Sequence, residues 1–370
     1  MRTWLTERFG LSVPVVAAPM AGVSTGRLTA AVSAAGGLGM LGVGPTSTPD
    51  RVREECAVAR AAGQFGVGLM AWALGQDDAL VDVVVDETPA LVSVSYGPYQ
   101  RWIAPLQAAG IVVATQVGTL EEAVAAEQAG VDVLVARGGE GGGHGRNDVA
   151  TLPLLQAVLD AVQVPVLAAG GIGTARGLAA VLAAGSAGAW VGTAFLACTE
   201  AATSAGAREL LLAAAETDTA YGRVFDVGQR LAWPPEYGGR ALRNAFFDRW
   251  VGREDELAGD EVAAAELSAA RKHGNFDVTC VYAGQGVALL RAERAAADVL
   301  GELAGAEGLL DRAAGRSRNG VAAGHSAASG RQTAQPDTAD PHPQMLYSDR
   351  FEDAPGAAPA LACRQARLAA

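Results

Sequence analysis

Lysine is nearly absent from this chain. Of the 28 basic residues, Lys272 is the only lysine and the others are arginines. Mechanisms that form a Schiff base on a lysine amine are therefore excluded from the main body of the chain. Cysteine is also scarce, and its positions are widely spaced without a C-x-x-C pair: Cys56, Cys198, Cys280 and Cys363. This spacing argues against a disulfide framework and against a zinc site, so we expect no metal.

Long apolar runs and excess positive charge are missing as well. No uninterrupted run of 18 or more apolar residues indicates a membrane helix, and the first residues, MRTWLTERFGLSVPVV, lack the regions of a signal peptide. The net charge of −12 at pH 7 disfavours nonspecific binding to nucleic acid or to anionic membranes. We therefore expect a soluble, cytoplasmic protein with a small-molecule substrate, and a homodimer is compatible with the sequence.

Eight short runs rich in Val, Ala and Leu recur along the first half of the chain. They begin at Val15, Leu38, Phe65, Ala90, Ile111, Val131, Val164 and Ala187. The runs are apolar throughout, which is typical of parallel strands covered on both faces. Segments with helix start and stop signals, such as TPDRVREECAVARAAG and TLEEAVAAEQAG, lie between them. This period predicts an α/β fold of the (β/α)8 TIM-barrel class, since a doubly wound fold would need G-x-G-x-x-G where this chain has APMAG.

The repeating pattern loosens after the eighth run. Residues 200–275 mix helical and loop signals, and we interpret them as an insertion, or lid, that folds over the barrel mouth before the last barrel helix. A helix is expected over residues 284–310, GQGVALLRAERAAADVLGELAGAEGLL. The barrel domain is then 1–314. Residues 315–370 are rich in Ser, Gly, Pro, Asp and Gln without an apolar period, so we expect a disordered tail there.

Two glycine-containing turns predict an anion site. AAGGIGT follows the seventh run and VGT follows the eighth, which is where TIM barrels commonly bind phosphate. Gly170, Gly171 and Gly173 lead into a helix whose first N–H groups can hold an anion, and Gly192 with Thr193 can add an N–H and a hydroxyl. The alternative is that these glycines only form tight turns.

The segment GGEGGGHGR, residues 138–146, follows the sixth run and therefore belongs to the barrel mouth. Its glycines indicate either a slack linker or a close approach of the backbone to a ligand. His144 has the side chain whose ordinary pKa suits proton transfer near neutrality, so it is the candidate base. Glu140 could orient that imidazole or cap a turn. Arg137 could point at the ligand or form a salt bridge at the rim.

The remaining candidates are weaker. His273 lies beside Lys272 in a polar stretch, and His325 and His342 lie in the tail. Trp233, before Pro234 and Pro235, could belong to an apolar lid, but packing in the core or on the surface is the preferred interpretation.

Four stretches carry a resemblance to a known family. They are APMAGVSTGRLTAAVSAAGGLGMLG, ARGGEGGGHGR, VPVLAAGGI with VGTAFLACTE, and VYAGQGVALL. Over roughly residues 11–310 the chain resembles the nitronate monooxygenases, formerly called 2-nitropropane dioxygenases, which are FMN-dependent TIM-barrel enzymes. The resemblance implies that the insertion segment around Asn244 covers the barrel.

The resemblance also implies site residues. His144 matches the family's catalytic histidine. The residues implied to bind FMN are Pro19, Met20, Ala21, Gly22, Gly68, Gln116, Arg137, Gly138, Gly143, Gly170, Gly171, Gly192 and Thr193. Three positions depart from the family pattern: Gly68 stands where Asn is usual, Arg137 where Gln is usual, and Gly141 where Ala is usual. The first two departures bear on the tuning of the flavin, because Arg137 would stabilise an anionic reduced form.

The implied reaction is oxidation of a nitronate or nitroalkane by O2 to a carbonyl compound and nitrite, with His144 as base and no nicotinamide. The alternative on the same scaffold is an FMN-dependent NAD(P)H reductase of the enoyl-ACP reductase II or quinone reductase type. A barrel with a nucleophilic cysteine after the sixth strand is excluded because no cysteine is there. A non-catalytic flavin binder is disfavoured because simple binding needs no imidazole at the ring.

Overall fold

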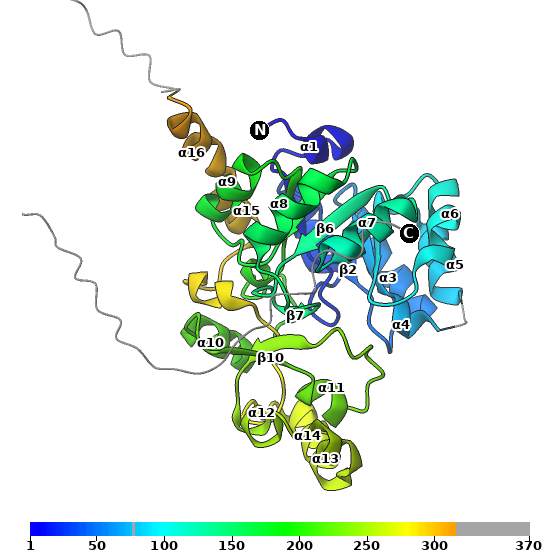
Figure 1. Ribbon diagram of the computed structural model, residues 1–370, viewed down its shortest axis with the longest axis vertical. Coiled ribbons are helices and arrows are strands. Elements are labelled where there is room, and N and C mark those ends of the chain that lie inside the picture. The colour runs from blue at the N-terminus through cyan, green and yellow to red at the C-terminus, as the bar shows by residue number, and fades with distance from the viewer. Residues whose placement is uncertain (76–77, 316–370) are drawn as a thin grey trace, which may run out of the picture. The chain divides into compact units, whose positions relative to one another are not determined.

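The computed structural model describes residues 1–75 and 78–315, and within them the eight expected strands form one parallel sheet (Figure 1). The strands are β1 (Val15–Ala17), β2 (Met40–Gly42), β3 (Gly66–Met70), β4 (Leu91–Ser95), β5 (Val112–Val117), β6 (Val133–Arg137), β8 (Val166–Ala169) and β9 (Gly188–Val191). Sheet neighbours follow chain order, and β1 also pairs with β9. A parallel bridge between Val16 and Leu38 joins the two remaining edges, so the sheet closes and the (β/α)8 class is confirmed.

Helices follow the strands as the sequence predicts. Those around the barrel are α2 (Gly26–Ala34), α3 (Pro49–Arg60), α5 (Ala79–Glu87), α6 (Gln100–Ala108), α7 (Leu120–Gln128), α8 (Thr151–Ala161), α9 (Ala175–Ala183) and α15 (Ala296–Ala304). The hydroxyls of Thr48, Thr119 and Thr174 accept backbone N–H groups at the starts of α3, α7 and α9. These N-caps explain why the helices begin where they do. Shorter helices are α1 (Trp4–Phe9), α4 (Ala71–Leu74), η1 (Thr193–Phe195) and α16 (Ala306–Ala313).

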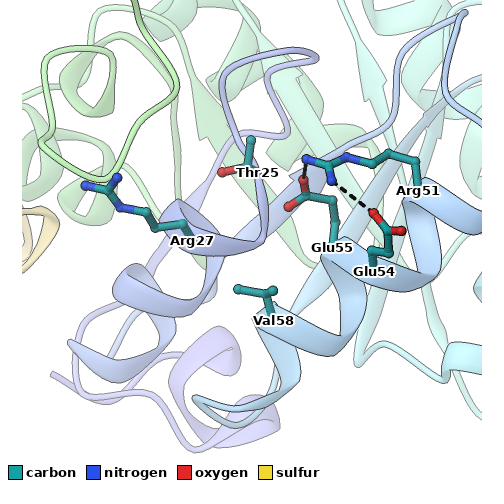
Figure 2. A pocket seen from close by; sticks show the side chains of 6 residues that line it. All are labelled: Thr25, Arg27, Arg51, Glu54, Glu55 and Val58. Carbon is teal, nitrogen blue, oxygen red and sulfur yellow. Dashed lines mark hydrogen bonds and ion pairs between the residues drawn. The ribbon is translucent and has the colours of Figure 1, made fainter.

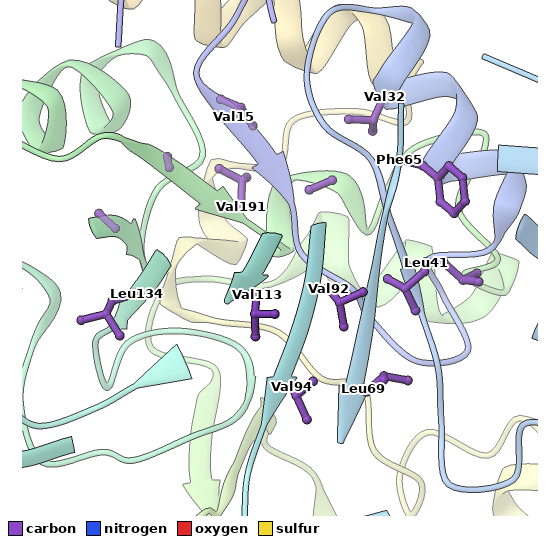
Figure 3. Packing of buried hydrophobic residues seen from close by; sticks show 14 of the residues in the cluster. Val15, Val32, Leu41, Phe65, Leu69, Val92, Val94, Val113, Leu134 and Val191 are labelled. Atoms are coloured by element: carbon purple, nitrogen blue, oxygen red, sulfur yellow. The ribbon is translucent and has the colours of Figure 1, made fainter. Parts of the chain in front are cut away.

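The apolar core has two layers. One lies between strands and helices, and Figure 3 shows part of it, with Val15, Val92 and Val113 among the valines that the strands contribute. The other fills the barrel interior and includes Leu5 of α1. Leu5 packs at Gly188, the first residue of β9, so α1 covers the amino-terminal end of the barrel. The carboxyl ends of the strands are left for the functional site.

An insertion separates β9 from α15. It contains α10 (Ala205–Ala213), β10 (Thr219–Gly222), α11 (Val224–Gly228), β11 (Gly239–Leu242), α12 (Ala245–Trp250), α13 (Glu254–Gly259), α14 (Glu261–His273) and η2 (Gln285–Leu289). Its strands form a second, antiparallel sheet with β7 (Gly143–His144), in the order β10-β11-β7. In Figure 1 the helices α11 to α14 gather beyond β10, away from the barrel helices. The insertion is therefore joined to the glycine-rich segment 138–146 by a β-ladder.

One expectation about this region is wrong. Residues 284–310 do not form a single helix: the 3₁₀ turn η2 comes first, and helix α15 begins only at Ala296. The reason is that the start of the segment is bound to the barrel mouth. The Gly284 N–H donates to Thr193 Oγ1 and the Gln285 N–H donates to the Glu140 carbonyl. The tail expected after residue 315 lies outside the described residues.

Candidate active site

The glycine-rich segment wraps around a buried arginine. Arg137, the last residue of β6, is 4% exposed. Its guanidinium donates to the carbonyls of Gly141 (2.6 Å), Arg146 (2.8 Å), Gly143 (3.0 Å) and Gly142 (3.3 Å). A planar guanidinium presents five donors in a fixed fork, which suits several carbonyls at once. The segment is therefore an ordered loop shaped by Arg137.

The glycines are explained by this wrapping. A Cβ at Gly145 would stand 2.7 Å from Arg137 Nη1, and a Cβ at Gly142 would overlap the backbone of Gly284. Gly145 also has a φ of +151°, which disfavours any side chain. The close approach expected from the sequence is thus first of all an approach to Arg137 and to neighbouring backbone.

Of the two roles considered for Arg137, the salt bridge at the rim is wrong, because no carboxylate pairs with it in the described part of the chain. Both Nη atoms donate to loop carbonyls, and the role of Arg137 toward a ligand stays a prediction. Burial lowers the pKa of Arg137, because the surrounding protein desolvates the cation. A second buried arginine, Arg240 of β11, donates to the Gly139 carbonyl and to Asn147 Oδ1 and holds the loop from the other side.

His144 is held by this loop and by the insertion together. It lies on β7 opposite Gly239 of β11. Its Nε2 is 2.8 Å from Oδ1 of Asp226, which lies on α11 and is 2% exposed. A carboxylate can only accept, so the neutral imidazole carries its proton on Nε2. Nδ1 is left as the basic atom, and no described residue hydrogen-bonds to it.

Asp226 is the functional residue that the sequence interpretation missed. It lies 82 positions after His144, so no local spacing connects the two. The available signal was an aspartate flanked by apolar residues in VFDVG, where a buried charge needs a partner. Tyr282 supplies a second contact, its hydroxyl lying 3.4 Å from the same Oδ1. Burial raises the pKa of Tyr282 well above its usual range, so this hydroxyl keeps its proton and donates.

Glu140 takes the second of its two expected roles. Both of its carboxylate oxygens accept the N–H of Thr151 at the start of α8, at 3.1 and 3.2 Å. A carboxylate at this place satisfies a free N–H and complements the helix dipole. Because Glu140 is bound to Thr151, Asp226 is the carboxylate that pairs with His144.

Aromatic side chains enclose the imidazole. Trp233 stacks on His144 with ring centroids 3.6 Å apart and an interplanar angle of 4°. The indole also contacts Trp72 at 4.9 Å and Tyr96 at 5.2 Å. Trp233 is 7% exposed, which agrees with the preferred interpretation of buried packing, and the ring against which it stacks is the candidate base. Gln116 of β5 reaches the same group, its Nε2 donating to the Tyr96 hydroxyl at 2.7 Å.

The two expected anion-binding turns lie at one rim of the barrel. Gly170 and Gly171 have φ values of +112° and +68°, and the N–H groups of Gly171, Ile172 and Gly173 donate to no described residue. These free donors precede α9, whose dipole favours an anion. The donor set fits a phosphate group. A hollow of about 720 Å³ beside Gly171 is lined mainly by residues 213–216 and 285–291.

The turn after β1 is folded against two neighbouring strands. The backbone of Met20 and Ala21 lies where a Cβ of Gly42 would stand, and the Pro19 ring lies where a Cβ of Gly68 would stand. Met20 also reaches Gly192, its sulfur lying 3.6 Å from a Cβ built there. An Asn in place of Gly68 would therefore overlap Pro19. This packing accounts for the glycine at the departure from the family pattern.

Three further glycines belong to the residues expected to bind FMN: Gly138, Gly143 and Gly22. The space beside Gly138 is filled by Thr151 and Glu140, whereas the space beside Gly143 is open. Gly22 has a φ of +78°, and the space beside it is also open. Gly143 is therefore the loop position where another molecule could approach the backbone.

Other features of the described chain carry no comparable chemistry. A hollow of about 450 Å³ between α2 and α3 is lined by Arg51, Glu54 and Glu55. Arg51 forms ion pairs with both glutamates (Figure 2). Burial raises the pKa of Cys56 and of Cys198 to about 12, so both are protonated thiols at neutral pH. The described residues contain no cluster of three or more metal-binding side chains, and none of their helices could span a membrane.

Replacing Arg137 should loosen the whole loop. Arg137→Met keeps an unbranched side chain but removes the donors to four carbonyls, and each buried carbonyl left unpaired costs about 1–3 kcal/mol. We expect the free energy of unfolding to fall by about 3 kcal/mol or more and the amides of residues 138–146 to exchange faster with deuterium. Arg51→Met, at an exposed ion pair, should cost less than about 1 kcal/mol. Unchanged exchange in the loop would contradict this role of Arg137.

Comparison with known proteins agrees with this geometry. The family model described as nitronate monooxygenase matches residues 2–73 and 67–305. The nitronate monooxygenase of Paraburkholderia phytofirmans is 34% identical, over 79% of this chain and 92% of that protein. The solved nitroalkane oxidase of Streptomyces ansochromogenes is 32% identical with a TM-score of 0.71, covering 84% of this chain and 99% of that one.

Other relatives carry different names. A Rhodococcus jostii protein named (3aS,4S,5R,7aS)-5-hydroxy-7a-methyl-1-oxo-octahydro-1H-indene-4-carboxyl-CoA dehydrogenase is 39% identical over 61% of this chain, which spans 64% of that protein's length. FabK from Thermotoga maritima superimposes with a TM-score of 0.74 at 28% identity, covering 85% of this chain and 99% of that one. The family model nevertheless covers most of the described residues. The chain belongs to the nitronate monooxygenase family, a family of oxidoreductase enzymes.

Proposed function

We propose that this protein uses FMN to oxidise nitronates and nitroalkanes by O2 to a carbonyl compound and nitrite, with His144 as the base. The observation that carries the proposal is the His144–Asp226 pair at the barrel mouth, which leaves Nδ1 basic and unpaired among the described residues. A nitro group makes the neighbouring C–H acidic, so a fixed imidazole near neutral pH suits its removal.

The free N–H groups before α9 support a flavin phosphate at Gly170, Gly171, Gly192 and Thr193. The ring would lie among the other expected residues: Pro19, Met20, Ala21, Gly22, Gly68, Gln116, Gly138 and Gly143. FMN would supply the electron acceptor and the reactivity with O2. Arg137, whose Nη atoms donate to the loop, would act on the flavin through its positive charge.

Asp226 and Tyr282 each support the removal of the substrate proton by His144. Asp226 fixes the tautomer that leaves Nδ1 free, and its charge stabilises the imidazolium that forms when Nδ1 takes the substrate proton. Tyr282 holds the carboxylate in place by donating to it. The insertion, residues 200–275 in the sequence interpretation, would exclude water as a lid, since Asp226 and Trp233 both come from it.

His144→Asn should separate two substrates. A neutral nitroalkane needs the base, so its kcat/KM should fall by about 10²–10⁴-fold. A preformed nitronate has already lost that proton, so its kcat/KM should change by less than about tenfold. Steady-state oxygen uptake with nitroethane and with ethylnitronate measures both. Equal losses of kcat/KM on the two substrates would contradict the assignment of His144 as base.

Asp226→Asn should produce a similar split through the lost charge. The amide oxygen can still accept from Nε2 and from the Tyr282 hydroxyl, but the neutral amide no longer stabilises the imidazolium that forms at His144. We expect turnover of the neutral nitroalkane to fall by about 10²–10⁴-fold, with little change for the nitronate. Asp148→Asn, an equal charge change at an exposed position of the same region, is the control. If both aspartate variants behave alike, the charge of Asp226 does not support the base.

A second candidate is an FMN-dependent NAD(P)H reductase or a dehydrogenase of thioester substrates. It is favoured by the high structural similarity to FabK and by the 39% identity to a relative named as a carboxyl-CoA dehydrogenase. Anaerobic mixing of the flavin-loaded protein with ethylnitronate and, separately, with NADPH distinguishes the two. Bleaching of the flavin absorbance by the nitronate alone is expected, and rapid bleaching by NADPH alone would replace our proposal with the reductase.

A further inference from the structure

Aromatic residues are few in this chain, at 5% of the sequence, yet they gather at the candidate base. Trp233 lies at the centre of the group and contacts His144, Trp72 and Tyr96, while Tyr237 contacts Tyr96 at 5.5 Å. These side chains come from segments as far apart as α4 and the connection between α11 and β11. Such a concentration beside a reactive group indicates a binding wall for flat apolar groups.

The stretch that carries Trp233 is held by side chains and hardly by its backbone. Residues 232–236 belong to no helix or strand, and Pro234 and Pro235 have no N–H to donate. In the described part of the chain their one backbone hydrogen bond, from the Tyr237 N–H to the Pro234 carbonyl, is internal to the turn. The position of the indole therefore depends mainly on its ring contacts, and a ligand with a comparable ring could compete for them.

The geometry at His144 determines which part of a substrate would contact the indole of Trp233. Proton transfer to Nδ1 runs in the plane of the imidazole, along its lone pair. The indole lies parallel to that plane at 3.6 Å and is the larger ring system, so its face extends beyond the imidazole. A substituent on the reacting carbon must then lie beside the aromatic wall. The buried Nε1–H of Trp72, which has no acceptor among the described residues, offers a donor next to this wall.

We propose that Trp233 is the specificity-determining residue of this site and selects substrates whose reacting carbon bears a flat aromatic group. The inference deepens the proposed function and rests on it for the reaction. It assigns the substrate class as aryl-substituted nitroalkanes and nitronates, in preference to short alkyl ones. Trp233 recognises the substituent and takes no proton itself.

A pair of variants tests this role. Trp233→Phe keeps a flat ring, whereas Trp233→Leu keeps apolar volume without one. The ratio of kcat/KM for phenylnitromethane nitronate over ethylnitronate should fall about tenfold in Trp233→Leu and stay within about threefold in Trp233→Phe. Trp4→Phe, on α1 at the other end of the barrel, should leave the ratio unchanged. A ratio that is the same in wild type and in Trp233→Leu would overturn the assignment.

A binding measurement keeps this test separate from the reaction. Phenylacetate and propionate carry a planar carboxylate in place of the nitronate group and cannot be oxidised in this way, and calorimetry on the flavin-loaded protein gives their Kd values. The preference for phenylacetate should fall about tenfold in Trp233→Leu but persist in Trp233→Phe. If neither nitronate bleaches the wild-type flavin while this preference behaves as stated, the proposed reaction fails and the role of Trp233 stands. An unchanged preference in Trp233→Leu refutes the role whatever the reaction.

Discussion

The guanidinium of Arg137 is the constraint on which the site depends. A buried cation without a carboxylate partner is costly, and here four loop carbonyls offset that cost. To bring those carbonyls to one fork, the chain must curl tightly, which explains the run of glycines. The same curl delivers His144 to the barrel mouth. The glycines and the arginine are thus one structural unit, and neither can be understood from the flavin alone.

This unit also joins the two halves of the chain. The curl exposes the edge of β7, and β11 of the insertion pairs with it at Gly143 and His144. Arg240, on that strand, then binds the Gly139 carbonyl and closes the loop from the opposite side. As a result the base comes from the barrel and its carboxylate partner, Asp226, comes from the insertion. A movement of the whole insertion would separate this pair.

The sequence predicts the barrel well because each strand is a continuous apolar run and many helices have local caps. It predicts His144 and the two anion-binding turns because their positions after particular strands place them at one rim. It does not predict Asp226, Tyr282 or Trp233 as site residues, since their contacts with His144 join residues more than 80 positions apart in the sequence. It identifies Arg137 as a candidate but does not predict its contacts with the loop carbonyls, because the direction of a side chain at the end of a strand depends on the loop that follows.

The relatives carry names of different activities, and these can be reconciled if the base and the substrate-contacting aromatic residues are considered separately. A C–H beside a nitro group and a C–H beside a thioester carbonyl are both acidic, and both can lose a proton to a neutral imidazole held by a carboxylate. The His144–Asp226 pair would therefore serve either chemistry without change. Discrimination must come from residues that touch the rest of the substrate. In this chain those residues are the aromatic side chains around Trp233, whose turn makes one internal backbone hydrogen bond. Selectivity can then change in that turn while the base, the loop and Arg137 stay as they are.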